Sequence, residues 1–393
     1  MQLDPLLAAL ALVVVSSVVI KYASDSFETA SSYLGRRMAA GIKGATINAI
    51  GSSMPELLTT AVFLFAYHDL DGFSAGVATA AGSAVFNGLV IPSLCIFVVA
   101  FFGVKRAGRT ERVRHIEVDS RTVLRDGIWL VVGEITLIVF LGTTTLTWVA
   151  GACLLLCYVG YILHLMHHNR VYGAGTENDE ETNEGSGGAS TELRSRMRAL
   201  LKLDFNEAYF RGRPFNARRA WIVLASSVSV LAAACFLLAE AVVESAQALG
   251  VPTYFTAVVL AAAATSVPDT VLSVKDARNG LYDDAVSNAL GSNIFDIAVS
   301  LGLPLLVYSL IYGDVSLTAA TGASAADVQS LRILLLCVTV VVIVLFLAGR
   351  KAGVGKASVM LVLYLGWMTW IADSAFDLGL FISESSATEA LLR

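Results

Sequence analysis

Ten long apolar stretches dominate the sequence and restrict what the chain can fold into. A helix needs about 20 mostly apolar residues to cross the hydrocarbon core of a bilayer. Only 15% of the residues are charged, against about 25% in soluble proteins. The sequence therefore predicts an all-α polytopic membrane protein with ten transmembrane helices. These helices are expected at residues 5–24, 44–67, 76–102, 124–142, 146–166, 220–244, 252–274, 284–312, 331–349 and 355–376.

The composition also excludes several classes of protein. A soluble enzyme, a disordered chain and a small disulfide-linked secreted domain do not carry 56% hydrophobic residues over 393 positions. A net charge of −5, without a basic domain in the sequence, argues against a nucleic-acid-binding protein. The lipid bilayer is therefore the first partner that the sequence indicates.

The basic residues are distributed unevenly among the predicted loops. Of the 27 Lys and Arg residues, 24 lie in the connections that follow odd-numbered helices. Cytoplasmic loops are enriched in Lys and Arg, so these connections are expected in the cytoplasm. Both termini are then expected outside, and the regular alternation supports a count of ten helices. The prediction is a multi-pass protein of the cell membrane with extracellular N and C termini.

A long polar segment at residues 168–218 divides the chain into two halves of five helices, 1–167 and 219–393. Within it, Gly173–Ser190 is rich in Gly, Ser, Thr, Asn and acidic residues and cannot bury a core. The following Leu193–Phe210 is expected to form an amphipathic basic helix on the inner membrane surface. A regulatory cation-binding role for the acidic residues is the alternative, although they lack EF-hand spacing. The whole segment is predicted to be cytoplasmic.

Each half carries the same pair of short motifs in its second and third helices. Gly-Ser-Ser-Met-Pro-Glu ends at Glu56, and Ala-Thr-Ser-Val-Pro-Asp ends at Asp269, 213 residues later. Gly-Ser-Ala-Val-Phe-Asn ends at Asn87, and Gly-Ser-Asn-Ile-Phe-Asp ends at Asp296, 209 residues later. Because five is an odd number, the second copy enters the membrane upside down relative to the first. The sequence thus predicts two inverted five-helix repeats, an arrangement typical of secondary transporters.

These motifs place oxygen-bearing side chains on one face of each helix. A carboxylate in the middle of a membrane helix costs about 2.5–3.5 kcal/mol, so Glu56, Asp269 and Asp296 need cations or polar partners. The other polar motif residues lie three or four positions before these acids or Asn87, on the same helix face. Carboxylate, hydroxyl and amide oxygens without sulfur or imidazole suit Ca²⁺ and Na⁺. The residues that supply these other oxygens are Ser52, Ser53, Ser83, Thr265, Ser266, Ser292 and Asn293.

Two motif prolines are expected to add backbone oxygens. Pro55 and Pro268 lack the N–H that would bond the carbonyl four residues earlier, which frees the carbonyls of Gly51 and Ala264. A freed carbonyl at membrane depth is tolerated only where it lines a cavity or binds an ion. Small residues also allow membrane helices to approach closely. We expect such close packing at Gly51, Gly82 and Gly291.

The two motif pairs resemble the alpha-repeats of the calcium/cation antiporter superfamily. The resemblance covers nearly the whole chain and is sharpest at residues 44–98 and 253–305. Within the superfamily, Ala84 and Asp269 are similar to the potassium-dependent sodium/calcium exchangers, because plain exchangers commonly have Asn and Glu there. The resemblance implies a secondary transporter, not an enzyme, and no cofactor. It would exchange inward-moving Na⁺ for outward-moving Ca²⁺ by alternating access.

The resemblance also implies a role for each motif residue. Glu56 and Asp269 would be the central ligands for which Ca²⁺ and Na⁺ compete, and Asn87 and Asp296 would complete the middle of the site. Asp296, helped by Asn293, is where the family places potassium sensitivity. The flanking Na⁺ sites would be formed by Ser52, Ser53, Ser83, Thr265, Ser266 and Ser292, with the carbonyls of Ala49 and Ala262.

Two questions about the ions stay open at this point. After Ca²⁺ binds, three carboxylates keep one negative charge that K⁺ can neutralise, but a proton on one buried acid can neutralise it equally. H⁺/Ca²⁺ antiport on the same scaffold is therefore the alternative function. An intramembrane aspartyl protease and an ion channel are more distant alternatives. The acids here follow prolines in symmetric Ser/Thr-rich repeats, which is unlike the setting of protease aspartates.

Overall fold

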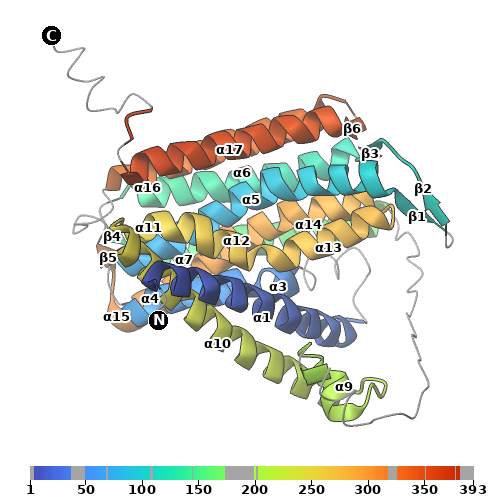
Figure 1. Cartoon of the computed structure of the whole chain (residues 1–393), viewed down its shortest axis with the longest axis horizontal. Helices are drawn as coiled ribbons and strands as arrows, with labels where there is room; N and C mark the ends of the chain where they lie inside the picture. Colours follow the sequence, from blue (N-terminus) through green and yellow to red (C-terminus); the bar gives the residue numbers. More distant parts are fainter. Residues whose placement is uncertain are drawn as a thin grey trace.

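The computed structural model of the protein is a bundle in which most long helices run roughly parallel to one another (Figure 1). The described part of each predicted apolar range falls almost entirely on helix. The structure describes residues 4–36, 49–67, 70–106, 109–143, 145–172, 199–200, 202–316, 325–349, 351–376 and 378–380.

In the first half of the chain, several predicted helices are longer than expected, the first by the most, and one is broken. The first helix continues to Leu34, because its polar last turns pack against other helices and no breaker precedes Gly35. The predicted helix at 44–67 is interrupted at Ser53. The helices of this half are α1 (Pro5–Leu34), α3 (Ala49–Ser52), α4 (Met54–Tyr67), α5 (Leu70–Phe102), α6 (Ser120–Leu141) and α7 (Trp148–Tyr172).

In the second half, two predicted helices contain irregular turns. The one at 252–274 holds a π-helical turn at Ala257–Ala261 and breaks at Ser266, and the one at 284–312 holds a π-helical turn at Asp296–Ser300. Such turns are frequent at functional sites. The α-helices here are α9 (Phe205–Phe210), α10 (Ala217–Leu249), α11 (Thr253–Thr256), α12 (Ala262–Thr265), α13 (Val267–Arg278), α14 (Tyr282–Phe295), α15 (Gly302–Tyr312), α16 (Ala325–Leu347) and α17 (Val354–Phe376).

Not every helix is long and apolar enough by itself to be recognised as a membrane span. Within the described residues, six helices pass by length and composition, and the pair Thr253–Thr265 and Val267–Arg278, bent by 43°, makes a seventh. α6 is long, but Arg125, Asp126 and Glu134 interrupt its apolar sequence. The protein is therefore a multi-pass helical membrane protein, and the count of ten spans stays a prediction.

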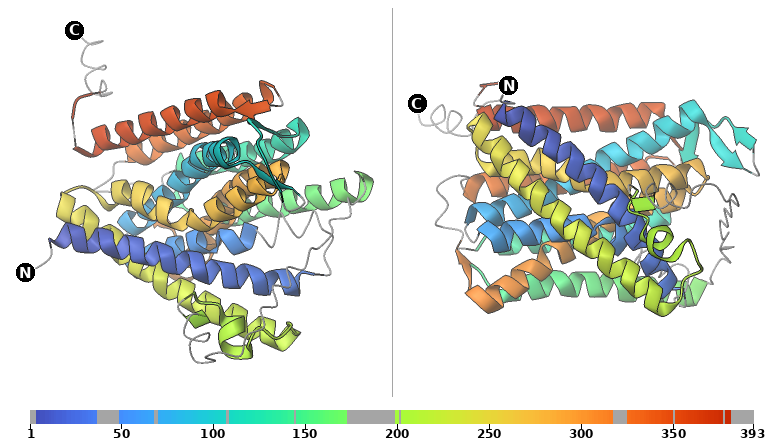
Figure 2. Two further views of the ribbon diagram at one scale, coloured as in Figure 1. Left: turned by 45° about the vertical axis from the view of Figure 1, so that its right-hand side comes forward. Right: turned by 60° about the horizontal axis from the view of Figure 1, so that its bottom comes forward.

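The helices α1 and α10 form a separate pair at one face of the bundle. They lie side by side and cross the other helices obliquely (Figure 2). Behind them, α5 packs against α4, α13, α14, α16 and α17, so it lies at the centre of the remaining helices. The polar motif residues are carried by α3, α4, α5 and the segments from α12 to the π-helical turn at Asp296–Ser300.

Among the described residues, three short antiparallel ribbons connect loops, and two of them have a reciprocal arrangement. β3 (His115–Glu117), before α6, pairs with β6 (Lys351–Gly353), which follows α16. β4 (Thr145–Leu146), after α6, pairs with β5 (Val315–Ser316), which precedes α16. The two ribbons lie at opposite ends of the bundle (Figure 1). This pattern of pairing is expected if α6 and α16 occupy equivalent positions in the two halves and run in opposite directions. The third ribbon pairs β1 (Val104–Arg106) with β2 (Arg109–Glu111).

The expected amphipathic helix at Leu193–Phe210 is wrong in its described part. Residues 199–200 are helical, but a turn follows in which Leu203 has a φ of 50°. A new helix then begins, because the Asp204 side chain accepts a hydrogen bond from the Glu207 N–H and caps α9. Phe205 is buried with Ala30 of α1 and Val223 of α10, so this segment packs on the α1–α10 pair. Residues 193–198 and Gly173–Ser190 lie outside the described residues.

Candidate cation-binding site

Two interrupted helices position the central carboxylates. The chain breaks at Ser53, between α3 and α4, and at Ser266, between α12 and α13. A proline follows each break, and the next residue is an acid in the first turn of the new helix, Glu56 in α4 and Asp269 in α13. The first turn of a helix has N–H groups without intrahelical partners, and these favour a negative charge. Both carboxylates are completely buried.

A single glycine allows α5 to approach the second half of the chain. A Cβ atom at Gly82 would lie 2.1 Å from the carbonyl oxygen of Val258 and 2.8 Å from the Cβ of Ala262, so any side chain there would clash. At Gly51 and Gly291 the nearest atoms to such a Cβ are 3.5 Å and 3.7 Å away, which is ordinary contact. The expected close packing is therefore found at Gly82 and is wrong for the other two glycines.

The carboxylate of Asp269 has hydrogen-bond partners from both halves of the chain. Ser292 of α14 donates to its Oδ1 at 2.8 Å, and Asn87 of α5 donates to its Oδ2 at 3.3 Å. The hydroxyl of Ser52, at the end of α3, also interacts with it. In the other direction, Thr265 at the end of α12 interacts electrostatically with Glu56. Each repeat thus places a hydroxyl near the acid of the other repeat.

The hydroxyl of Ser83 lies between the other two acids. Its Oγ is 3.0 Å from Asp296 Oδ2 and 3.5 Å from Glu56 Oε1. It is also 2.9 Å from Ser266 Oγ and accepts a hydrogen bond from Asn87 Nδ2 at 3.3 Å. One hydroxyl has a single proton to donate, so Ser83 satisfies only one of its neighbours at a time. The site therefore has more hydrogen-bond acceptors than hydrogen-bond donors.

Several buried oxygens of this cluster have no hydrogen-bond partner. They are the second carboxylate oxygens of Glu56 and Asp296 and the amide oxygens of Asn87 and Asn293. The amide nitrogen of Asn293 is already used, because it donates to the carbonyl of Ala84 at 2.9 Å. Within the described part of the chain, none of the three acids forms a salt bridge. Buried anionic oxygens without basic partners favour the binding of cations.

The structure buries every motif side chain that the sequence singled out for this site. Among the described residues, no three His, Cys, Asp or Glu side chains form a metal-holding group of their own. A cation here would therefore bind hydroxyl and amide oxygens together with carboxylates, which is the hard-ligand chemistry of Ca²⁺ and Na⁺. The side chains are at most 3% exposed and belong to Ser52, Ser53, Glu56, Ser83, Asn87, Thr265, Ser266, Asp269, Ser292, Asn293 and Asp296.

The carbonyl freed by Pro268 has a partner on another helix. The Ser17 hydroxyl of α1 donates to the carbonyl of Ala264 at 3.3 Å. This carbonyl is therefore used by the α1–α10 pair in this conformation, instead of facing only the site. On the other side of the pair, the Cys235 thiol of α10 lies 3.6 Å from the carbonyl of Pro55.

The carbonyl of Ala262 is also occupied. It accepts the Ser266 N–H at 3.1 Å and the Thr265 hydroxyl at 3.3 Å, and a carbonyl oxygen has two lone pairs. The sodium-ligand role that the resemblance implied for it stays a prediction, and a cation there would compete with the Thr265 hydroxyl for this oxygen. Ala49 begins α3, and its side chain lies outside the described residues.

Comparison with known proteins agrees with this geometry. The profile of the sodium/calcium exchanger protein family matches residues 8–166 and 219–372. The chain belongs to this family. It is thus a member of a family of cation exchangers, as the motif resemblance implied.

Two relatives of this chain match over short stretches. Sodium/potassium/calcium exchanger 2 of Mus musculus is 34% identical over 126 residues, which are 32% of this chain and 19% of that protein. Sodium/potassium/calcium exchanger 1 of Bos taurus is 48% identical over 67 residues, 17% of this chain and 6% of that protein. The matched stretches therefore span less than a fifth of these relatives.

Two solved structures share the fold of this chain at low sequence identity. The sodium-calcium exchanger NCX_Mj superposes with a TM-score of 0.53 at 20% identity, covering 92% of this chain and 97% of that chain. The H⁺/Ca²⁺ exchanger CAX superposes with a TM-score of 0.64 at 14% identity, covering 99% and 86%. These similarities establish the fold alone.

Two polar residues beside the candidate site were missed by the sequence analysis. Asn288 of α14 donates to Ser273 Oγ at 2.9 Å and to the carbonyl of Asp269 at 3.5 Å. Its amide also interacts with the Asp269 carboxylate. Asn288 precedes Ser292 by four residues and Ser273 follows Asp269 by four, so helical spacing from the motifs would have found both. Asn288 is half-buried, whereas the other partners of that carboxylate are buried.

Proposed function

We propose that this exchanger is a secondary antiporter that moves Na⁺ inward and Ca²⁺ outward across the cell membrane. The observation that carries the proposal is the symmetric pair of acids. Glu56 and Asp269 lie at equivalent breaks in membrane helices and share one ring of hydroxyl and amide oxygens without a basic partner among the described residues. Ca²⁺ and Na⁺ are the abundant cations that prefer such oxygens.

Exchange rather than leak follows from electrostatics. Glu56, Asp269 and Asp296 repel one another in the buried site. A cation neutralises these charges and lets the site close, while the empty site would bury uncompensated carboxylates at a high cost. The empty transporter therefore resists crossing between its outward-open and inward-open states. Each Ca²⁺ that leaves must be replaced by Na⁺ before the site can return.

The α1–α10 pair is the element that we propose to move. It packs obliquely on the helices that carry the site. One of its contacts is the hydrogen bond that the Ser17 hydroxyl donates to the Ala264 carbonyl. Single hydrogen bonds of this kind contribute only about 0.5–1.5 kcal/mol each. They can be broken and remade as the pair slides. We propose ten spans, extracellular termini and a cytoplasmic 168–218 segment for the same topology.

We propose that K⁺ accompanies Ca²⁺. After Ca²⁺ binding, the three buried carboxylates leave one negative charge, and Asp296 Oδ1 is a buried oxygen without a partner. The curated relatives with matching stretches are named sodium/potassium/calcium exchangers. A monovalent cation beside Asp296 would complete the neutralisation.

H⁺/Ca²⁺ antiport is the second candidate function, favoured by the structural similarity to the exchanger CAX. Calcium uptake into vesicles that contain the purified protein separates the two. An imposed Na⁺ gradient, with pH clamped on both sides, drives Ca²⁺ flux only in the sodium-coupled case. A pH gradient without Na⁺ drives it only in the proton-coupled case.

A further inference from the structure

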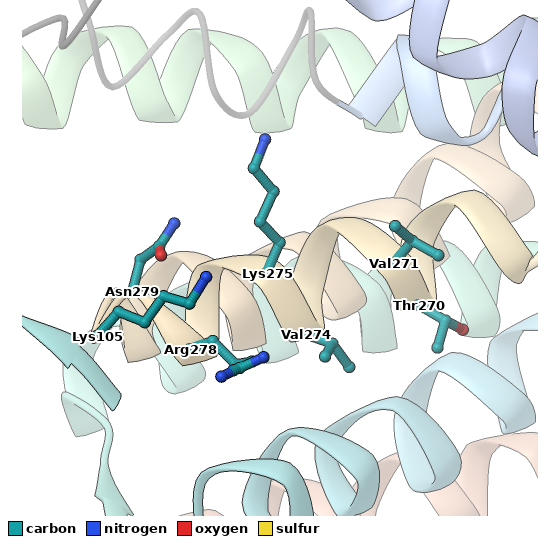
Figure 3. Close-up of a pocket in the computed structure, with 7 residues that line it drawn as sticks. All are labelled: Lys105, Thr270, Val271, Val274, Lys275, Arg278 and Asn279. Atoms are coloured by element: carbon teal, nitrogen blue, oxygen red, sulfur yellow. The ribbon is translucent and has the colours of Figure 1, made fainter. Parts of the chain in front are cut away.

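A groove of about 350 Å³ follows one face of α13 away from the cation site. Three of its lining residues are basic: Lys275 and Arg278 on α13, and Lys105 on β1. Val271 and Val274 form an apolar wall. Figure 3 shows Lys105 and Arg278 gathered at one end, Val271 toward the other end and Lys275 between them. The groove is therefore amphipathic along its length.

The basic side chains of this groove, Lys105, Lys275 and Arg278, form no salt bridges within the part of the chain that is described. The Arg278 Nε atom is buried and has no hydrogen-bond partner. Glu28 of α1 attracts Lys275 electrostatically without forming an ion pair. Three cations around one groove, one of them with a buried free donor, are complementary to an anionic group.

The position of the groove indicates where that anionic group comes from. Lys105 lies just beyond the end of α5 and Arg278 at the end of α13, in connections predicted to be cytoplasmic. Next to Lys105, the side chains of Phe101 and Phe102 are 70% and 66% exposed, as expected for residues that face lipid. Val271 on the apolar wall is 41% exposed. An occupant with a charged head at the interface and an apolar tail matches this surface.

We infer that an anionic phospholipid of the cytoplasmic leaflet binds in this groove. Its phosphate contacts Lys105, Lys275 and Arg278, and an acyl chain lies on Val271 and Val274. The inference rests on the proposed function only for the orientation of the protein in the membrane. Asp269 lies in the first turn of α13, and the basic residues of the groove lie further along the same helix. Their positive charge repels cations that approach the site from the cytoplasm. A bound lipid phosphate neutralises this charge.

Native mass spectrometry of the purified full chain, titrated with phosphatidylglycerol or phosphatidylcholine in detergent, tests this inference without measuring transport. We expect phosphatidylglycerol to bind more tightly than phosphatidylcholine. The triple variant Lys105→Gln, Lys275→Gln, Arg278→Gln should lose this preference, with phosphatidylglycerol binding weaker by about tenfold or more. A matched control that loses the same charge at exposed positions outside the groove, Arg112→Gln, Arg114→Gln, Arg121→Gln, should keep it.

Two further binding measurements distinguish a lipid headgroup from free phosphate as the bound anion. Val274→Asn should weaken phosphatidylglycerol binding while the basic residues remain, and inorganic phosphate should not displace the lipid. Lys105→Gln alone, in a surface ribbon, should weaken binding severalfold even if the triple variant fails to fold. Equal loss in the control variant, displacement by inorganic phosphate, or unchanged binding in Lys105→Gln and the triple variant would overturn the inference. A transport failure would leave these binding results unaffected.

Discussion

Asn87, on the third predicted helix of the first half, donates a hydrogen bond at 3.3 Å to Asp269, on the second predicted helix of the second half. The two residues are 182 positions apart in the chain. The Ser83–Asp296 hydrogen bond, at 3.0 Å, crosses between the halves in the same way. Neither half therefore contains a complete ring of oxygens. The site lies where the two halves of the chain meet, which fits the inverted repeats that we propose.

The charges of Glu56 and Asp269 should be indispensable for calcium transport. Glu56→Gln and Asp269→Asn keep the size and one carbonyl oxygen of each side chain but remove the negative charge. We expect Ca²⁺ flux in reconstituted vesicles to fall to the background of protein-free vesicles. Near-normal flux in either variant would remove that residue from the ion site. Circular dichroism and thermal unfolding of the purified variants check that the fold is kept.

Neutralising Asp296 should change the response to potassium more than the response to sodium. Asp296→Asn removes the charge that we assign to K⁺ while Glu56 and Asp269 remain to hold Ca²⁺. We expect Na⁺-driven Ca²⁺ flux to persist and to become insensitive to K⁺. The measurement is Ca²⁺ uptake over a series of K⁺ concentrations in the wild type and the variant. A wild-type protein that ignores K⁺ would show that the potassium assignment is wrong.

The two motif glycines at equivalent positions should differ in their tolerance of alanine. A Cβ at residue 82 meets the Val258 carbonyl oxygen at 2.1 Å, whereas a Cβ at residue 291 meets nothing closer than 3.7 Å. We expect Gly82→Ala to destabilise the protein by about 1–3 kcal/mol, as overpacking does, and to reduce transport. Gly291→Ala is the matched control and should be tolerated. Similar melting temperatures for the two variants would contradict this packing of α5.

Asn288 should tune the affinity of the site through Asp269. Asn288→Leu keeps the approximate volume but removes the donor to Ser273 and to the Asp269 carbonyl, each worth about 0.5–1.5 kcal/mol. We expect the apparent affinity for Ca²⁺ to fall severalfold without loss of folding. The equivalent position in the first half is Thr79, whose hydroxyl bonds the Ala75 carbonyl of its own helix at 2.8 Å. Thr79→Val should therefore leave the affinity unchanged, and equal effects would argue against a specific role for Asn288.

The polar residues of the site could be predicted from the sequence because a charged side chain within a membrane helix costs free energy and is therefore rare. A carboxylate within an apolar helix is conspicuous, and its repetition with the same neighbours after 213 residues identified Glu56 and Asp269 together. Helical spacing then found the hydroxyl residues on the same face. The exposed fractions of these side chains, all 3% or less, agree with a buried polar cluster.

Other features depended on contacts between distant helices and could not be predicted in this way. The Ser17 hydroxyl reaches the Ala264 carbonyl across 247 positions, and no local pattern marks Ser17 among the serines of α1. The π-helical turn at Asp296–Ser300 depends on how backbone hydrogen bonds shift within an apolar helix. The turn at Leu203 ended the expected amphipathic helix because Asp204 caps a new one.

Calcium flux under an imposed sodium gradient shows whether Glu56 and Asp269 carry out sodium-coupled calcium exchange. Purified protein is reconstituted into vesicles loaded with Na⁺, pH is clamped on both sides, and Ca²⁺ uptake is followed with and without an outward Na⁺ gradient. We expect uptake that requires the Na⁺ gradient in the wild type and is absent in Glu56→Gln and Asp269→Asn. Uptake that is indifferent to Na⁺, or that persists in both variants, would contradict this expectation.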